Sequence, residues 1–410
     1  MGSKTKRKQN PFFCNLLLQL LLLQTCSNFA KAGSIVQFLP GFEGHLPFEL
    51  ETGYIGVDES EDVQLFYYFI KSESNPETDP LLLWLTGGPG CSSFSGLAYE
   101  IGPIVFEQFL YDGTLPKLIL NPYSWTKVAS IIFVDQPSGT GFSYARTAKA
   151  SHSSDLQVSD QLYEFLGKWF IDHREFISNP VYVGGDSYAG VIVPVVSQLI
   201  LNGNEVGIER KIDFKLISMT RKAHILEPYC GLDFPEDPNG KYGERRSLTE
   251  LFSTQKMEGR IPITCRTDEM WLSYYWSNDE SVREALQIRK GTIGEWIRCN
   301  SNISYTENLV NAVPYHANIS RKGYPSLIYS GDHDLLIPHF ATEAWIKSLN
   351  YQIVNDWRQW IVGGQVAGYT RTYANKMTFA TVKGGGHTAP QYKPEQCQAM
   401  FKRWISNQPL

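Results

Sequence analysis

The sequence predicts an α/β fold with a mostly parallel central sheet flanked by helices, and two observations lead to this prediction. Short apolar runs with the character of strands alternate along the chain with segments of helical periodicity. Such alternation is typical of a parallel sheet with helices on its faces. The length of 410 residues, of which 42% are apolar, suffices for one large domain with an inserted lid or for two modest domains.

The predicted elements follow one another along residues 33–410. A helix is expected over 155–170, where the apolar residues fall close to one face, and another begins at Pro394. Residues 219–300 are polar and rich in Pro and Gly, so we expect a lid inserted there rather than sheet core. The predicted strands are apolar runs that end in glycine-rich turns: Gln64–Ile70, Leu81–Leu85, Ile131–Val134, Val181–Val183, Leu327–Tyr329 and Thr378–Val382.

The first 32 residues are predicted to be a secretory signal peptide. A basic start around Arg7 precedes the apolar run Leu16–Leu23, and Ala30–Ala32 offers small residues for cleavage. The run is too short for a membrane anchor, which needs ~20 residues. The formal net charge of −5 argues against nucleic-acid binding. We therefore expect a soluble extracellular or vacuolar protein with no membrane span and no nucleic-acid partner.

Secretion also bears on the cysteines and on glycosylation. An odd number of cysteines beyond residue 32 allows up to two disulfides and one free thiol in an oxidising compartment. None of them lies close in sequence to another Cys or to a His, so we expect no zinc, and no cofactor is indicated. Asn302 and Asn318 begin Asn-Ile-Ser sequons and are predicted glycosylation sites.

The segment Val181–Gly190 predicts a nucleophile elbow. An extended run meets a sharp Gly-Asp-Ser-Tyr-Ala turn, and a helix-capable stretch follows from Val191. A serine held in such a strained turn needs small neighbours, which Gly185 and Ala189 supply, although Gly is commoner than Ala at the second position. Ser187 is therefore the candidate nucleophile.

A serine nucleophile needs a base, and the base needs an acid that orients it. In hydrolases with this elbow the acid and then the His follow the serine along the chain. The acidic turn after the strand at 327–329 offers Asp332 and Asp334, and we favour Asp334 because it stands four residues before Pro338. His387, in a glycine-rich loop after the next strand, is the candidate base. The alternative for the acidic turn is a metal site built from Asp332, His333, Asp334 and His339.

The glycine-rich segment Thr86–Gly90 predicts an oxyanion hole. Consecutive glycines after a strand let backbone N–H groups face a developing negative charge. Gly88 is our candidate donor from this loop, and Tyr188, the residue after the nucleophile, is the second. A simple tight turn is the alternative interpretation.

The chain carries six ordered motifs: Trp84–Ser93, Glu100–Pro103, Phe133–Tyr144, Gly185–Gly190, Gly331–Asp334 and Gly385–Pro390. Together they resemble the serine carboxypeptidase family. The resemblance runs from about Gly33 to Leu410 and implies an α/β-hydrolase fold, with Ser187, Asp334 and His387 as the catalytic triad and with Gly88 and Tyr188 as the oxyanion hole. It also implies a disulfide between Cys91 and Cys299, which leaves Cys230 and Cys265 as a default second pair and Cys397 as a buried thiol.

The resemblance implies a substrate site at Trp84, Thr86, Glu100 and Asp186. Carboxypeptidases of this family bind a terminal carboxylate with an Asn, here Thr86, and with two Glu, here Asp186 and Glu100; the two carboxyls can share a proton. Thr and Asp at these positions are similar to the plant branch that transfers an acyl group from a glucose ester to an alcohol or acid. We favour that small-molecule acyl donor and acceptor over a peptide C-terminus, with an inactive binding protein as the third hypothesis.

The chain departs from the family pattern between Asn202 and Cys230. Ile212–Met219 runs directly into Thr220–Cys230, and the Gly-Asn-Pro motif that the family carries after this strand occurs nowhere in the chain. We interpret the chain as a shortened form. Compared with a full-length relative, we expect the reduced lid to lower the stability and to shift the remaining activity from transfer towards hydrolysis, because water enters the cleft more easily.

Overall fold

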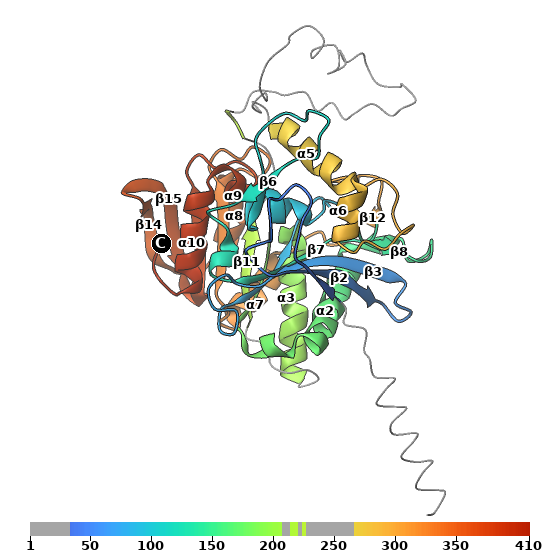
Figure 1. Cartoon of the computed structure of the whole chain (residues 1–410). Coiled ribbons are helices and arrows are strands. Elements are labelled where there is room, and N and C mark those ends of the chain that lie inside the picture. Colours follow the sequence, from blue (N-terminus) through green and yellow to red (C-terminus); the bar gives the residue numbers. More distant parts are fainter. Residues whose placement is uncertain (1–32, 207–213, 220–223, 227–265) are drawn as a thin grey trace, which may run out of the picture. The chain divides into compact units, whose positions relative to one another are not determined.

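The computed structural model describes residues 33–206, 214–219, 224–226 and 266–410 (Figure 1). The predicted signal peptide, the pairing of Cys230 with Cys265 and most of the predicted lid lie outside these residues. The described end of the lid region forms the helices α5 (Arg266–Asn278) and α6 (Glu280–Ala285) rather than strands. Trp276 of α5 is fully buried, and its ring stacks on Phe94 at 5.0 Å between centroids.

A 12-stranded sheet runs through the described residues, in the order β1-β2-β3-β7-β4-β10-β11-β13-β16-β15-β14, with β8 paired to β3. Every pairing from β7 to β16 along this order is parallel, which confirms the mostly parallel sheet. The strands are β1 (Gly33–Val36), β2 (Leu50–Val57), β3 (Val63–Ile70), β4 (Leu81–Leu85), β7 (Ser130–Val134), β8 (Tyr144–Ala145), β10 (Val181–Gly185), β11 (Phe214–Met219), β13 (Ser326–Gly331), β14 (Ile353–Val362), β15 (Gln365–Tyr373) and β16 (Met377–Val382).

Both edges of the sheet are antiparallel, which the sequence did not predict. Except for β3 and β7, these antiparallel partners are consecutive strands of the chain, and β14 and β15 are joined by a tight hairpin. Its turn is Gly363-Gly364, and both residues have positive φ, 55° and 76°. Two glycines accept that conformation without steric cost, which is the usual chemistry of a tight hairpin turn.

The two faces of the sheet are covered by different helices, as alternation along β3 shows. Tyr67 and Phe69 contact aromatic residues of α2, whereas Phe66 and Tyr68 face Phe142 and Phe94 on the other side. Successive side chains of a strand point to opposite faces, so one apolar strand serves two cores. The smaller elements are β5 (Ile104–Phe106), β6 (Leu118–Leu120), β9 (His152–Ser154), β12 (Ser304–Thr306), η1 (Gly96–Glu100), η2 (Trp125–Lys127), η3 (Arg174–Ser178) and η4 (Ala374–Lys376).

The predicted helices form where the apolar stripes indicated. On one face, the predicted helix 155–170 is α2 (Asp155–Asp172), which packs against α3 (Ala189–Val206). On the other face, α10 (Pro394–Ile405) stacks Phe401 on Trp125 at 4.1 Å between ring centroids. No helix among the described residues is long and apolar enough to cross a membrane. The remaining helices are α7 (Val313–Arg321), α8 (His339–Ser348) and α9 (Ala389–Tyr392).

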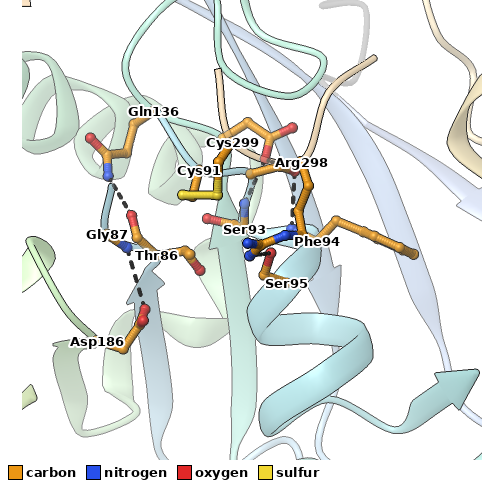
Figure 2. Close-up of a disulfide and its surroundings, with 12 residues drawn as sticks. Thr86, Gly87, Cys91, Ser93, Phe94, Ser95, Gln136, Asp186, Arg298 and Cys299 are labelled. Atoms are coloured by element: carbon orange, nitrogen blue, oxygen red, sulfur yellow. Dashed lines mark hydrogen bonds between the residues drawn. A yellow bond between two sulfur atoms is a disulfide. The ribbon is translucent and has the colours of Figure 1, made fainter. Parts of the chain in front are cut away.

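A disulfide between Cys91 and Cys299 ties two distant parts of the chain, 208 residues apart in sequence (Figure 2). Backbone hydrogen bonds flank it on both sides, from Ser92 N to Arg298 O at 2.7 Å and from Asn300 N to Gly90 O at 2.8 Å. Cys397 is a buried free thiol, in agreement with the sequence. The disulfide therefore fixes the loop after β4 against the segment that begins at Arg298.

We expect alkylation of the folded, unreduced protein to leave Cys91 and Cys299 unmodified, and mass spectrometry to find them in one cross-linked peptide pair. Replacing both by Ala should lower the free energy of unfolding by roughly 2–5 kcal/mol, because the unfolded chain then gains freedom. Cys397→Ala is the matched control, since it removes a sulfur without removing a cross-link, and its effect should be smaller. Alkylated Cys91 in folded, unreduced protein would contradict the prediction.

Candidate active site

Ser187 lies between β10 and α3 in the sharp turn that the sequence predicts. Its φ of 55° is in the left-handed region, which a residue with a side chain adopts only where its surroundings impose it. Gly185 permits the turn, since a Cβ there would lie 2.8 Å from Ala189 Cβ and 2.4 Å from Leu85 O. Ser187 itself is partly exposed.

The acid and the base meet at the ends of neighbouring parallel strands. Asp334 follows β13 and His387 follows β16, and His387 Nδ1 lies 3.3 Å from Asp334 Oδ2. The other carboxylate of the acidic turn, Asp332, accepts the N–H of Gly384 at 2.7 Å instead. Of the two candidate acids, Asp334 is thus the one that contacts the candidate base, His387. In the described part of the chain, no group of three His, Cys, Asp or Glu side chains is placed to hold a metal ion.

The Asp334 carboxyl is buried and is hydrogen-bonded by the backbone. Burial raises the pKa of the Asp334 carboxyl to about 7, while the N–H groups of Leu336 and Ile337 act in the opposite direction. The nearer of these, Leu336 N, donates to Oδ1 at 2.9 Å. One carboxylate oxygen is therefore fixed by the backbone, and the other faces the imidazole.

The glycine loop after β4 touches the elbow directly. A Cβ at Gly87 would lie 2.5 Å from Ser187 Cβ and 2.5 Å from the backbone nitrogen of Tyr188, so only glycine fits. The Gly87 N–H points to Asp186 Oδ1 at 3.3 Å (Figure 2). Gly88, the predicted oxyanion donor, follows with a φ of 123°, which is also restricted to glycine.

The buried carboxylate of Asp135 accepts hydrogen bonds from this loop. Asp135 accepts the Ser92 hydroxyl at 2.7 Å and the Ser93 N–H at 2.8 Å through one oxygen, and the Phe142 N–H at 2.9 Å through the other. Burial raises the pKa of Asp135 to about 6, and these hydrogen bonds lower it. Asp135 therefore links the loop that carries Gly87 to the turn after β7.

The predicted substrate residues Thr86, Glu100 and Asp186 lie in the interior, each about 3% exposed. Within the described residues, Thr86 Oγ1 and Glu100 Oε2 have no hydrogen-bond partner. Burial raises the pKa of both carboxyls, and Asp186 raises that of Glu100 further. Two buried carboxyls of this kind cannot both ionise at low cost, so the pair holds a proton at acidic pH.

Arg298 is the cation beside this carboxyl pair, and the sequence did not single it out. It lowers the pKa of both Glu100 and Asp186, while burial lowers its own. Figure 2 shows its guanidinium reaching towards Ser95, with Nη1 3.4 Å from the hydroxyl. Arg298 is the residue before Cys299. The disulfide to Cys91 that the resemblance implies could therefore have placed Arg298 near the glycine loop.

Trp84 stands apart from the other predicted substrate residues. Its ring is fully buried on β4, packed edge-on against Trp125 at 5.6 Å between centroids. A Cβ at Gly96 would lie 2.6 Å from the indole nitrogen of Trp84 and 3.3 Å from Thr86 Oγ1. Trp84 therefore lies in the core beneath the site, close to Thr86.

His224 links the acid turn to the base loop and was not predicted. Its backbone pairs with that of Asp334, and its Nε2 lies 2.9 Å from His333 Nδ1 and 3.3 Å from Gly384 O. A Cβ added at Gly386 would lie 3.0 Å from the Cβ of His224. His224 therefore packs beside Gly386, the residue before His387. His224 lies in the segment where the chain departs from the family pattern, and no motif there indicated a contact.

The two sequons lie in different settings. Asn302 is exposed in a turn, where its N–H donates to Asn300 Oδ1 at 3.0 Å. Asn318 lies on α7, and its amide donates to Gln198 Oε1. Glycosylation of both remains a prediction.

Comparisons with known proteins agree with the prediction that this chain is a shortened form. The family model for serine carboxypeptidases matches residues 40–220 and 223–407, with its interruption inside the departing segment. Serine carboxypeptidase-like 7 from Arabidopsis thaliana is 49% identical over 437 residues, covering 98% of this chain and 100% of the relative. Serine carboxypeptidase-like 13 from the same plant is 50% identical over 424 residues, covering 96% and 98%. Both alignments are longer than this chain of 410 residues, so the relatives contain residues that it lacks.

The fold is also found among solved structures. A prohormone-processing carboxypeptidase from Saccharomyces cerevisiae, Kex1(delta)p, superposes with a TM-score of 0.71 at 19% identity, covering 92% of this chain and 96% of that one. The likeness establishes the α/β-hydrolase fold, and the family match and the Arabidopsis relatives establish the family. The chain belongs to the serine carboxypeptidase family.

Proposed function

We propose that this enzyme works through an acyl-enzyme on Ser187, with His387 as the base and Asp334 as the acid that orients it. The observation that carries the proposal is the contact of His387 Nδ1 with the buried Asp334 carboxylate, at the ends of β13 and β16 in the same sheet as β10, the strand that leads into the elbow. A proton on Nδ1, donated to Asp334, leaves Nε2 as the nitrogen that accepts the serine proton. Attack by Ser187 Oγ then forms an oxyanion, which Gly88 N–H and Tyr188 N–H stabilise.

For the second half of the reaction we favour acyl transfer. The donor is an acyl ester of glucose, and the acceptor is an alcohol or acid that replaces water in attacking the acyl-enzyme. The burial of Thr86, Glu100 and Asp186 supports this choice, because a peptide carboxylate would have to reach groups that are only about 3% exposed. Asp186 is in addition engaged by the Gly87 N–H. Thr86 offers no amide donor for a carboxylate.

Removal of C-terminal residues from peptides at acidic pH is the alternative, and the protonated carboxyl pair favours it. A carboxyl that keeps its proton can donate a hydrogen bond to a substrate carboxylate. An inactive hydrolase-fold binding protein is the third candidate, to which the shortened segment lends weight. In all three cases we propose that residues 1–32 direct the chain to the secretory pathway, for an extracellular or vacuolar location.

A p-nitrophenyl phosphonate should label Ser187. In this step Ser187 Oγ bonds to phosphorus, p-nitrophenolate leaves, and the serine proton passes to His387. Ser187→Ala should abolish the label, and His387→Ala should slow it by a factor on the order of 10³, because the hydroxyl then lacks a base. Peptide mapping provides the measurement, and a label on the fully buried Ser92 or Ser93 would refute the assignment.

Substrate preference should depend on Thr86 and Asp186. We expect the wild-type protein to consume an acyl-glucose with an alcohol acceptor faster than any blocked dipeptide. The double variant Thr86→Asn, Asp186→Glu should gain peptidase activity, because it restores the amide donor and the longer carboxyl. Parallel assays with both substrates test this, with Ser187→Ala as the blank. Efficient trimming of peptides by the wild-type protein, without use of glucose esters, would reverse the preference.

The two activities should also differ in their pH dependence. Base catalysis needs the ionised form of Asp334, so the rate of acyl transfer should rise as the pH increases through about 7. Binding of a peptide carboxylate also needs the proton on the Glu100–Asp186 pair, and burial raises the pKa of Asp186 to about 7. Peptidase activity should therefore be limited to acidic pH and should fall as the pH increases through the same range. Acyl transfer from an uncharged glucose ester should show the rise alone. A bell-shaped profile for the ester would contradict this separation.

A further inference from the structure

Asp155, the first residue of α2, holds a buried carboxylate that contacts two other segments. Its side chain is 0% exposed. One oxygen accepts the hydroxyls of Tyr188 at 2.6 Å and Tyr305 at 2.8 Å, and the other accepts the Leu309 N–H at 2.7 Å. Tyr188 belongs to the elbow, whereas Tyr305 and Leu309 belong to the strap, as we call residues 298–309. A buried carboxylate is tolerated only with such donors, so these contacts fix its position.

The hydrogen bonds around Asp155 have a defined direction. A carboxylate only accepts, so both phenols must donate to it. Burial and the bond to Asp155 raise the pKa of Tyr305, which therefore keeps its proton. The carboxylate also lies at the N-terminus of the 18-residue helix α2, where the helix dipole favours a negative charge. Asp155 is thus a fixed hydrogen-bond acceptor for the hydroxyl of Tyr188.

Tyr188 is covalently adjacent to the strained residue of the elbow. The left-handed conformation of Ser187, with φ of 55°, persists only where neighbouring contacts determine it. The nitrogen of Tyr188 lies 2.5 Å from the position of a Cβ added to Gly87, so this amide stands where the elbow meets the glycine loop. A side chain fixed at its far end restricts the rotation of the residue and therefore the direction of its N–H.

We propose that Asp155 is a positioning residue for the reaction at Ser187. Through the Tyr188 hydroxyl it holds the elbow in its strained conformation and aims the Tyr188 N–H at the developing oxyanion. The proposal rests on the proposed function, in which this N–H is one of the two oxyanion donors. Asp155 acts through Tyr188 and does not contact the reacting atoms itself.

The structure offers a matched control for this proposal. Tyr188→Phe and Tyr305→Phe each remove one hydroxyl that donates to the same oxygen of Asp155. Only Tyr188 belongs to the elbow. Both variants keep the aromatic rings and their edge-on contact, 6.2 Å between centroids. If Asp155 only stabilised the fold, the two variants would have the same effect. If it positions the oxyanion donor, only Tyr188→Phe slows the chemistry.

The experiment measures inactivation by a p-nitrophenyl phosphonate over a range of concentrations, which separates the saturating rate from the half-saturating concentration. Asp155→Asn and Tyr188→Phe should each lower the saturating rate about tenfold or more, because a misdirected donor stabilises the oxyanion poorly. The half-saturating concentration should change little. The double variant should be no slower than either single variant, since both act through one hydrogen bond. Tyr305→Phe should keep the wild-type rate, although its melting temperature falls.

Three results would overturn the proposal: equal losses in Tyr188→Phe and Tyr305→Phe, wild-type rates in Tyr188→Phe, or additive losses in the double variant. Tyr188→Phe keeps the test decisive if Asp155→Asn fails to fold. A wild-type protein that does not react at Ser187 would instead overturn the proposed function. The wild-type measurement thus separates the two failures.

Discussion

The site depends on the parallel pairing of β4 with β10, which sets Leu85 beside Gly185. Because both strands end at this register, the loop after β4 and the elbow after β10 leave the sheet side by side. Their backbones approach so closely that a Cβ at Gly87 or Gly185 would overlap its neighbours. The strained conformation of Ser187 and the place of the glycine loop against Tyr188 N both follow from this approach. Asp334 and His387 are brought together in the same way, because each follows one of the two paired parallel strands β13 and β16.

The strap, residues 298–309, keeps these loops together from outside the sheet. Cys299 binds the glycine loop covalently, Arg298 compensates part of the charge of the Glu100–Asp186 pair, and Tyr305 meets Asp155. Each of these contacts lies beside a different part of the site. Buried charges recur here because each carboxylate can hold several backbone or hydroxyl donors at once. The arrangement leaves Ser187 accessible while its neighbours are fixed.

The sequence was sufficient for the elements whose signal is local. Apolar runs and the helical stripe at 155–170 predicted the parallel strands and α2, and ordered motifs led to Ser187, Asp334 and His387. The antiparallel edges were missed because an apolar run does not reveal the direction of its partner strand. Arg298, Asp155 and His224 were missed because their roles come from contacts between segments far apart in the chain. From the sequence, Asp155 is an ordinary acidic residue in the first turn of a helix. Only the structure shows that the hydroxyls of Tyr188 and Tyr305 both donate to it.

The central claim is that Ser187, His387 and Asp334 together form an acyl-enzyme. The most direct measurement is a rapid-quench time course with a p-nitrophenyl ester, read both as released p-nitrophenol and as the mass of the protein. We predict a burst of one p-nitrophenol per enzyme, with the acyl mass on the peptide that contains Ser187, followed by slower turnover. Release without a burst and without an acylated peptide, at a rate that Ser187→Ala retains, would contradict the account.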